Sequence, residues 1–178
     1  MRFARRIALA PLVVLLLAAG EAAPARGVYQ EPAAFVAEAF GGEPPPPKVL
    51  WVTGALRERV SRILGHPPRF LRVRYWLRGS RSAWVLEEIG KEQPITIGVV
   101  VDGGRIERIR VLIFRESRGW EVRERFFTRQ FDGAALREGD RLDRAIDGIS
   151  GATLSVRALT RIARVALVLH ARVAGGEP

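Results

Sequence analysis

The sequence predicts an α+β domain in which an antiparallel meander packs against helices and a buried helix ends the fold. Three observations support this class. Short segments of alternating apolar and polar residues, separated by tight turns, lie between residues 70 and 114. Amphipathic helical segments precede them, and one long, mostly apolar helical segment follows them. Helices and strands are therefore grouped along the chain, which is typical of α+β domains.

Two helices are expected before the meander. Residues 31–40 place Pro32 in a first helical turn, and the glycine pair at 41–42 ends the segment. Four consecutive prolines, residues 44–47, then form an extended connector. In residues 56–64 the apolar positions recur at helical spacing, with the charged positions between them turned to solvent.

The meander itself is predicted from four strand-like segments: residues 70–77, 83–89, 95–101 and 105–114, of which the first and the last alternate in polarity. Asp102-Gly103-Gly104 joins the last two as a hairpin turn, because glycine accepts positive φ. Trp84 and Leu86 are expected to face inward. Trp51 and Trp76 also lie in strand-like stretches, so we expect them to pack in the core.

The part of the chain after the meander changes in composition. Residues 115–120 are polar and glycine-containing, as in a loop that leaves a strand end. An aromatic cluster (Phe126, Phe127 and Phe131) and a connector over residues 140–146 follow. The final helix is predicted over residues 154–173, where arginines form one narrow stripe and nearly all other positions are apolar. Such a helix is packed on most sides.

Composition excludes several function classes. The 178 residues contain no cysteine, which rules out disulfides, thiolate metal sites, cysteine nucleophiles and covalently attached c-type haem. The two histidines have no metal-ligating partner at useful spacing, so no metal is expected. A nucleotide-binding GxGxxG fingerprint is absent from the sequence.

The formal net charge of +10 invites a nucleic-acid hypothesis, since 27 of the 29 basic residues are arginines. The arginines are scattered, however, and usually stand next to an acidic residue. No block of like charge and no nucleic-acid-binding signature is present. We therefore interpret the charge as a property of a solvated surface and expect no nucleic-acid partner.

The N-terminus has the order of a secretory signal peptide. Arginines within the first six residues precede an apolar run over residues 7–20, and small residues follow. Residues 23–25 (Ala-Pro-Ala) offer a cleavage site, and residues 18–20 a second one. We expect an exported protein, in the periplasm or on the outer face of the cytoplasmic membrane. An uncleaved N-terminal anchor is the alternative.

A glycine-containing motif directly precedes the final helix. Asp147-Gly-Ile-Ser-Gly-Ala-Thr153 ends in a hydroxyl residue at the expected helix N-terminus. The free N–H groups and the positive dipole end at such a position favour an anion near Thr153. The alternative is that Thr153 or Ser155 only caps the helix.

The pattern Asp147-x-x-Ser150-Gly151-Ala152-Thr153 resembles the flavinylation motif of the FMN-binding domain family, found in subunits of the sodium-translocating NADH:quinone oxidoreductase and related respiratory complexes. The match is complete at every specified position. The resemblance implies that a flavin transferase attaches FMN through a phosphodiester to the hydroxyl of Thr153. Asp147, Ser150, Gly151, Ala152 and Thr153 would then form the motif that the transferase recognises.

A second stretch, Glu116-Ser117-Arg118-Gly119-Trp120-Glu121, is similar to the Glu-Thr-x-Gly-apolar-Gly loop of the same family. Serine replaces threonine in it, and Glu121 stands where a glycine is common. The family brings both stretches together around the flavin, with Trp120 our candidate for the bed of its ring. The implied cofactor-binding residues are Thr153, Ser150, Gly151, Ala152, Leu154, Ser155, Glu116, Ser117, Gly119 and Trp120.

The order of the N-terminal residues and the resemblance together divide the chain into a signal peptide (1–25), a helical and strand extension packed on the domain (26–93) and an FMN-binding domain (94–178). It implies an exported flavoprotein that carries electrons to or from a membrane or periplasmic redox partner. Two other function classes remain open: a flavin-dependent reductase of a small extracytoplasmic acceptor, and a non-redox binding or assembly module. A serine-hydrolase hypothesis for Ser150 has little support, because no motif links either histidine to it.

Overall fold

The computed structural model describes residues 26–175. The predicted signal peptide, residues 1–25, lies outside the described residues. Within the described part, no helix combines the length and the apolar character needed to cross a bilayer.

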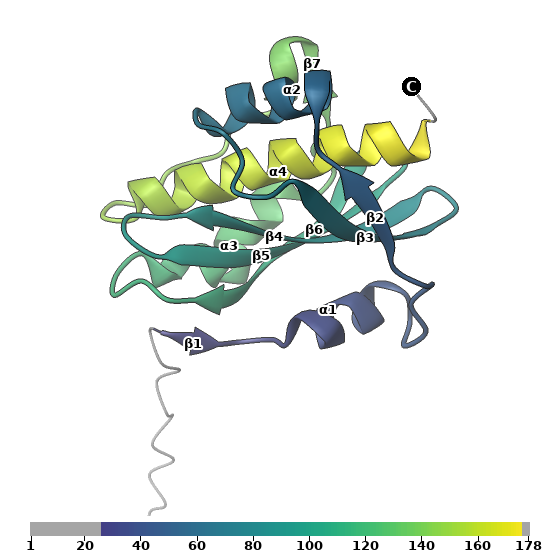
Figure 1. Cartoon of the computed structure of the whole chain (residues 1–178). Coiled ribbons are helices and arrows are strands. Elements are labelled where there is room, and N and C mark those ends of the chain that lie inside the picture. Colours follow the sequence, from purple (N-terminus) through teal and green to yellow (C-terminus); the bar gives the residue numbers. More distant parts are fainter. Residues whose placement is uncertain (1–25, 176–178) are drawn as a thin grey trace, which may run out of the picture.

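A six-stranded antiparallel sheet organises the molecule, with strand order β1-β6-β5-β4-β3-β2 (Figure 1). The strands are β1 (Gly27–Val28), β2 (Lys48–Trp51), β3 (Arg72–Arg78), β4 (Arg81–Ile89), β5 (Pro94–Asp102) and β6 (Arg105–Phe114). The predicted meander is confirmed as β3 to β6, and Gly103 and Gly104 adopt the positive φ angles expected of the hairpin turn. All residues from Ile95 to Val101 are buried because β5 lies in the centre of the sheet.

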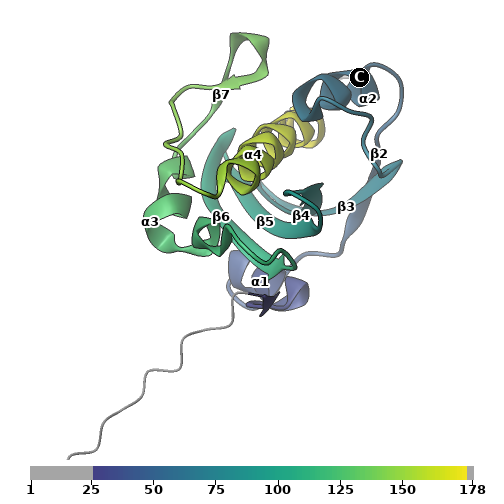
Figure 2. The same cartoon turned by 90° about the vertical axis from the view of Figure 1, so that its left-hand side faces the viewer.

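One face of the sheet curves around the C-terminal helix α4 (Thr153–Ala174), with α2 (Gly54–Leu64) beside that helix (Figure 2). The main core lies between α4 and the sheet and includes Trp84, Ile97 and Leu159, which are all fully buried. The thin polar stripe of the final helix predicted this placement. The fold class predicted from the sequence is therefore confirmed.

The opposite face is covered by α1 (Pro32–Ala39) (Figure 1). Phe35 and Val36 of this helix pack against Val100 and Leu112 in a second, smaller core. Gly98 makes the contact possible, because a Cβ at this position would lie 2.6 Å from the Phe35 ring. A larger residue at position 98 would push the helix away from the sheet.

Short elements connect β6 to α4. They are η1 (Trp120–Arg123), α3 (Arg125–Thr128), η2 (Arg129–Phe131), β7 (Leu136–Arg137), η3 (Glu138–Asp140) and β8 (Arg141–Leu142). The small β7–β8 hairpin occupies part of what the sequence predicted as a plain connector. Arg59 of α2 holds it through Asp140, at 2.7 Å between guanidinium and carboxylate. This long-range ion pair has no signature in the local sequence.

Two aromatic residues lie outside the core. Trp51 is 59% exposed, so the prediction that it packs inside is wrong. It stands on β2, at the edge of the sheet, with the Arg72 guanidinium 5.9 Å from its ring centre. Phe126 is also exposed, whereas Phe127 and Phe131 are fully buried with their rings edge to face.

Candidate functional site

The N-terminus of α4 begins at Thr153, with Ala152 at the N-cap position. No side chain caps this end, so the interpretation of Thr153 or Ser155 as a helix cap is wrong. The first helical bond runs from the Val156 N–H to the Ala152 carbonyl, 2.9 Å away. The N–H groups of the three preceding residues therefore lie ahead of the helical bonding pattern and can face an anion.

The motif before the helix is open to solvent. Asp147, Ser150, Gly151 and Thr153 are all exposed. Gly151 has a φ of +80°, and a Cβ placed on it would have no neighbour within 4 Å. Glycine is thus needed here for the backbone turn, and another molecule can approach Thr153 from this side.

The predicted second stretch comes directly against this helix end. A Cβ on Gly119 would lie 2.8 Å from the Ser155 hydroxyl and 3.4 Å from Ala152. Gly119 also has a φ of +81°. The juxtaposition of the two stretches that the resemblance implied is therefore present in the fold, and Gly119 is the residue that permits it.

Together the two stretches enclose a hollow of about 580 Å³. It is lined by Lys91, Glu116, Ser117, Arg118, Gly151, Ala152, Thr153, Leu154 and Ser155. Seven of the ten residues implied as cofactor-binding line this hollow, while Ser150, Gly119 and Trp120 do not.

A family model described as FMN-binding domain matches residues 90–168. This segment belongs to the FMN-binding domain family. The match begins in the turn between β4 and β5, ends within α4, and includes both stretches that line the hollow. In the other comparisons, no curated protein and no solved structure matches the chain.

Glu116 has a structural role in this FMN-binding domain. It is 5% exposed, and its Oε1 accepts backbone N–H bonds from Lys91, Glu92 and Gln93 at 2.5, 2.6 and 2.9 Å. Burial alone would raise the pKa of Glu116, but these N–H bonds hold that pKa below its ordinary value. Glu116 therefore remains an anion that ties the β4–β5 turn to the hollow.

Two cations of the hollow were not among the predicted site residues. Lys91 arrives from the β4–β5 turn, where its ammonium pairs with Glu92 at 3.3 Å, and Arg118 occupies the variable position of the second stretch. Arg118 was identifiable from its place in the motif. Lys91 had no such signal, because only the Glu116 hydrogen bonds bring its turn to the site.

The residues present fit the phosphate end of FMN. The exposed Thr153 hydroxyl stands at the uncapped end of α4, and two cations line the same hollow. The open space at Gly151 leaves room for a bulky substituent on Thr153. Helix N-terminal N–H groups together with cations form a favourable environment for a phosphate.

Trp120 lies just beyond the hollow. Its ring is half-buried against the main core, and the Arg123 guanidinium lies 4.9 Å from the ring centre. Arg123 also lies 4.3 Å from the Tyr29 ring centre, so the cation sits between two aromatic rings. The role of Trp120 as the bed of the flavin ring stays a prediction.

Both histidines have partners outside this site. His66 Nε2 lies 2.9 Å from Glu88 Oε1, and His170 Nδ1 lies 2.7 Å from the Ser82 hydroxyl. Among residues 26–175, no group of three or more His, Asp or Glu side chains is arranged to hold a metal ion.

Proposed function

We propose that FMN is attached covalently through a phosphodiester to the Thr153 hydroxyl, and that the exported protein acts as an electron-transfer carrier. The observation that carries this proposal is the position of Thr153. It ends a complete flavinylation motif, is exposed, and stands at the hollow where the second family stretch meets α4.

Each residue at the hollow has a separate part in this proposal. Thr153 supplies the bridging oxygen, while the N–H groups of α4 and the cations Lys91 and Arg118 offset the charge of the phosphate. Asp147 is exposed, and its N–H donates to Gln130 Oε1 at 2.7 Å, so the motif is held in a turn that a transferase can reach. When bound, FMN supplies the redox chemistry, and the protein supplies attachment and position.

A covalently attached FMN is consistent with an exported protein that transfers electrons. A covalent bond keeps the flavin on a protein that works in a dilute exterior. The exposed motif also leaves the cofactor close to the surface, where a membrane or periplasmic redox partner can approach it. The signal-like order of residues 1–25 supports the extracytoplasmic location.

Intact-mass measurement tests the attachment. We expect the full chain, exported from a host with a flavin transferase, to gain the mass of one FMN less one water. Thr153→Ala should abolish the gain while changing the free energy of unfolding by less than about 0.5 kcal/mol, since Thr153 is exposed and makes no capping bond. Asp147→Ala should reduce the mass gain. Thr160→Ala, on the same helix as Thr153, should leave the mass gain unchanged.

Flavin fluorescence that survives denaturing electrophoresis of Thr153→Ala would contradict the proposal. The location is tested separately by cell fractionation and by sequencing the N-terminus of the mature protein. Recovery of the protein in the cytoplasm with residues 1–25 intact would contradict the extracytoplasmic part alone.

A further inference from the structure

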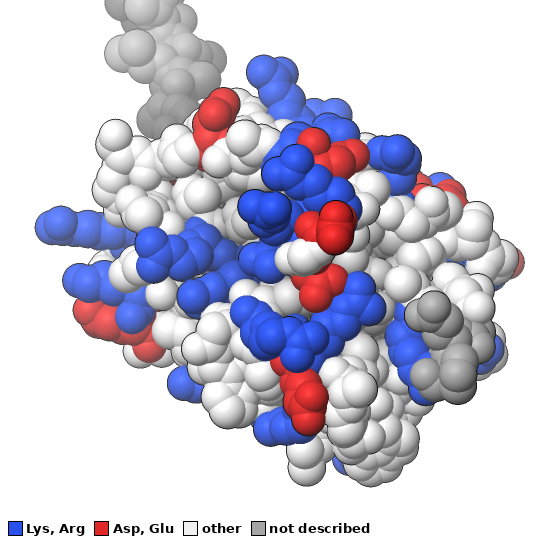
Figure 3. All heavy atoms as spheres, turned by 90° about the horizontal axis from the view of Figure 1, so that it is seen from above, with Lys and Arg blue, Asp and Glu red and all other residues white. Residues whose placement is uncertain are grey.

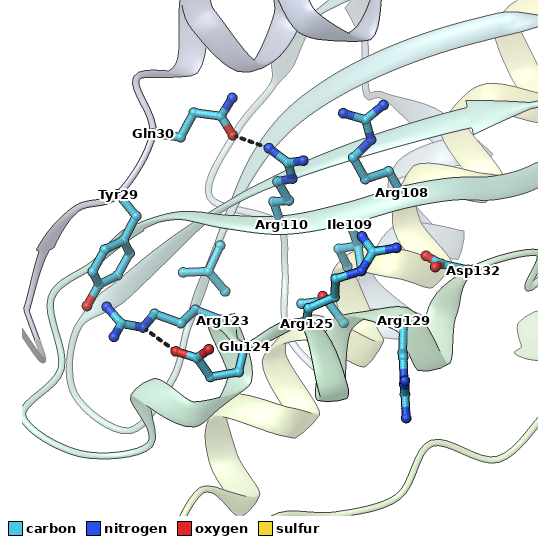
Figure 4. Close-up of a pocket in the computed structure, with 12 residues that line it drawn as sticks. Tyr29, Gln30, Arg108, Ile109, Arg110, Arg123, Glu124, Arg125, Arg129 and Asp132 are labelled. Atoms are coloured by element: carbon cyan, nitrogen blue, oxygen red, sulfur yellow. Dashed lines mark hydrogen bonds and ion pairs between the residues drawn. The ribbon is translucent and has the colours of Figure 1, made fainter. Parts of the chain in front are cut away.

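A second hollow, of about 470 Å³, lies at the edge of the sheet near β1 (Figure 4). It is bounded by the segment after β1, by strand β6, and by the short helices α3 and η2. Five of its lining residues are arginines: Arg108, Arg110, Arg123, Arg125 and Arg129. It shares no lining residue with the hollow at Thr153.

Local geometry brings these arginines together in pairs. Arg108 and Arg110 are two residues apart on β6, and alternate residues of a strand share one face. Arg125 and Arg129 are four residues apart across α3 and η2, and this spacing places side chains on one helical face. The fold then brings both pairs to one hollow; in the close-up, Arg125 extends toward β6 and Asp132, whereas Arg129 extends away from β6 (Figure 4).

Three of the arginines have acidic partners. Glu38 of α1 pairs with Arg108 and also with Arg110, the latter at 2.9 Å, and Arg123 pairs with Glu124 at 3.0 Å. In the part of the chain that the structure describes, Arg125 and Arg129 have no carboxylate within ion-pair distance, 4.0 Å. Two of the arginines that line the hollow are thus available to a ligand.

The face that carries α2 and α4 offers a comparison. Red side chains lie among the blue ones there (Figure 3), and Arg59 of α2 pairs with Asp140. At the arginine-lined hollow, five arginines are accompanied by four carboxylates: Glu38, Glu107, Glu124 and Asp132. Like charges at such spacing repel one another, and a bound anion would relieve that repulsion.

We propose that the arginine-lined hollow binds the phosphate groups of a small polyanion, with Arg125 and Arg129 as the main ligands. The planar guanidinium donates two parallel hydrogen bonds to a phosphate, a geometry that lysine cannot offer. Arg125 and Arg129 are exposed, so a ligand in solution can reach both guanidinium groups. The volume exceeds that of one phosphate and suits a diphosphate or a phosphorylated headgroup.

Asp132 limits the affinity of this site. Its carboxylate lines the hollow and shares the field of Arg125 and Arg108. Burial raises the pKa of Asp132 despite these arginines, so the charged carboxylate is not strongly stabilised there. An incoming phosphate competes with this carboxylate for the same cations, and neutralising Asp132 should tighten phosphate binding.

Calorimetric titration of the full exported protein with inorganic pyrophosphate at low salt tests the site. We expect saturable one-to-one binding, weakened about tenfold or more in Arg125→Gln/Arg129→Gln because two charge-assisted contacts are lost. Asp132→Asn should bind more tightly than the wild type. Arg62→Gln/Arg137→Gln, two exposed arginines elsewhere, gives the same change in net charge and should bind as the wild type does.

Vesicle sedimentation separates the two sources of phosphate. If a headgroup is the ligand, the protein should sediment with vesicles of phosphatidic acid in phosphatidylcholine but not with phosphatidylcholine alone, and pyrophosphate should displace it. Binding in either experiment that Arg125→Gln/Arg129→Gln weakens, and the control pair does not, supports the site. Equal loss in both double variants, or no saturable binding in either experiment, would overturn it. Loss of flavin attachment affects neither result.

Discussion

Thr153 is available for chemistry because of its neighbours. Ala152 occupies the N-cap position and has no side-chain oxygen to accept a bond from the free helix N–H groups, and Gly151 turns the chain with a positive φ. A serine or aspartate at position 152 would cap the helix and compete with any bound phosphate. At the residue scale, the absence of a capping side chain is therefore the property that a phosphate site requires.

His170, unlike Thr153, is buried, and both of its ring nitrogens have hydrogen-bond partners within the protein. Its Nε2 accepts the Gly104 N–H at 3.3 Å, so we assign the proton to Nδ1, which donates to the Ser82 hydroxyl. The Trp84 indole N–H donates to the same hydroxyl at 2.8 Å. Burial lowers the pKa of His170, with a small opposing effect of Asp102. The network ties the β5–β6 turn to the end of α4.

We predict that His170 makes the protein less stable in mild acid. Its pKa is lower in the folded chain than the unfolded value of about 6.5, so its contribution to stability is complete above that pH and is lost as the pH falls. Protonation at Nε2 would also break the bond from Gly104. His170→Gln should therefore lose less unfolding free energy than the wild type between about pH 7 and 5, measured by urea denaturation.

His66→Gln is the matched control, because the pKa of His66 is shifted in the opposite direction from that of His170. The hydrogen bond that His66 donates to the Glu88 carboxylate raises the pKa of His66, so His66 contributes stability at low pH, and this contribution is lost as the pH rises. Its removal should steepen the loss of stability in acid. Identical pH profiles for both variants and the wild type would show that neither histidine is linked to folding.

At the element scale, the site depends on how closely the loop after β6 approaches α4. Glu116 orders the β4–β5 turn, and Gly119 allows the backbone to reach the first turn of the helix. Neither residue needs to contact the cofactor to be essential for the site. Their shared role is to bring residues 91, 118 and 153 to one hollow.

Gly119→Ala should separate the loop from the helix. The new Cβ would lie 2.8 Å from Ser155, in addition to the strain of a positive φ, so we expect a loss of about 2 kcal/mol in unfolding free energy. Gly79→Ala is the control, because Gly79 also has a positive φ but no neighbour within 4 Å of a Cβ. Equal destabilisation and equal flavin content of the two variants would show that the close contact is unimportant.

At the scale of the whole molecule, one sheet joins the segments before and within the matched family region. β4 pairs with β5 along its whole length, from Arg81↔Asp102 to Ile89↔Pro94. Four of the six strands and the helices α1 and α2 precede β5. The α1 helix covers the face of the sheet opposite α4, so the residues before the predicted boundary at position 94 complete both sides of the fold.

Phe35→Ala should destabilise the molecule by about 3 kcal/mol or more, because a fully buried ring leaves a cavity. Gly98→Ala should also be destabilising, since its Cβ would meet the Phe35 ring. In the double variant the methyl group enters the space of the missing ring, so the two losses should not add. Urea denaturation of the wild type, the two single variants and the double variant gives the coupling free energy between positions 35 and 98. Additive losses would contradict the packing described.

Local sequence patterns were sufficient to predict the meander, the helices α1, α2 and α4 and the burial of α4, since alternation and helical spacing act over a few residues. The motif that ends at Thr153 was also recognisable from the sequence, because its residues are adjacent in the chain. The prediction that Trp51 packs in the core was wrong, because alternation in the sequence does not show which strand lies at the edge of the sheet.

The tertiary structure alone decided which distant residues meet. Lys91 reaches the hollow at Thr153 through Glu116, and Arg110 and Arg125 line one hollow only once β6 and α3 have packed together. The same is true of Glu38, which pairs with arginines about seventy residues further along the chain. The sequence determined the local elements and the attachment motif, because those depend on neighbouring residues. The arrangement of charge around both hollows depends on chain packing, which joins residues that no local pattern relates.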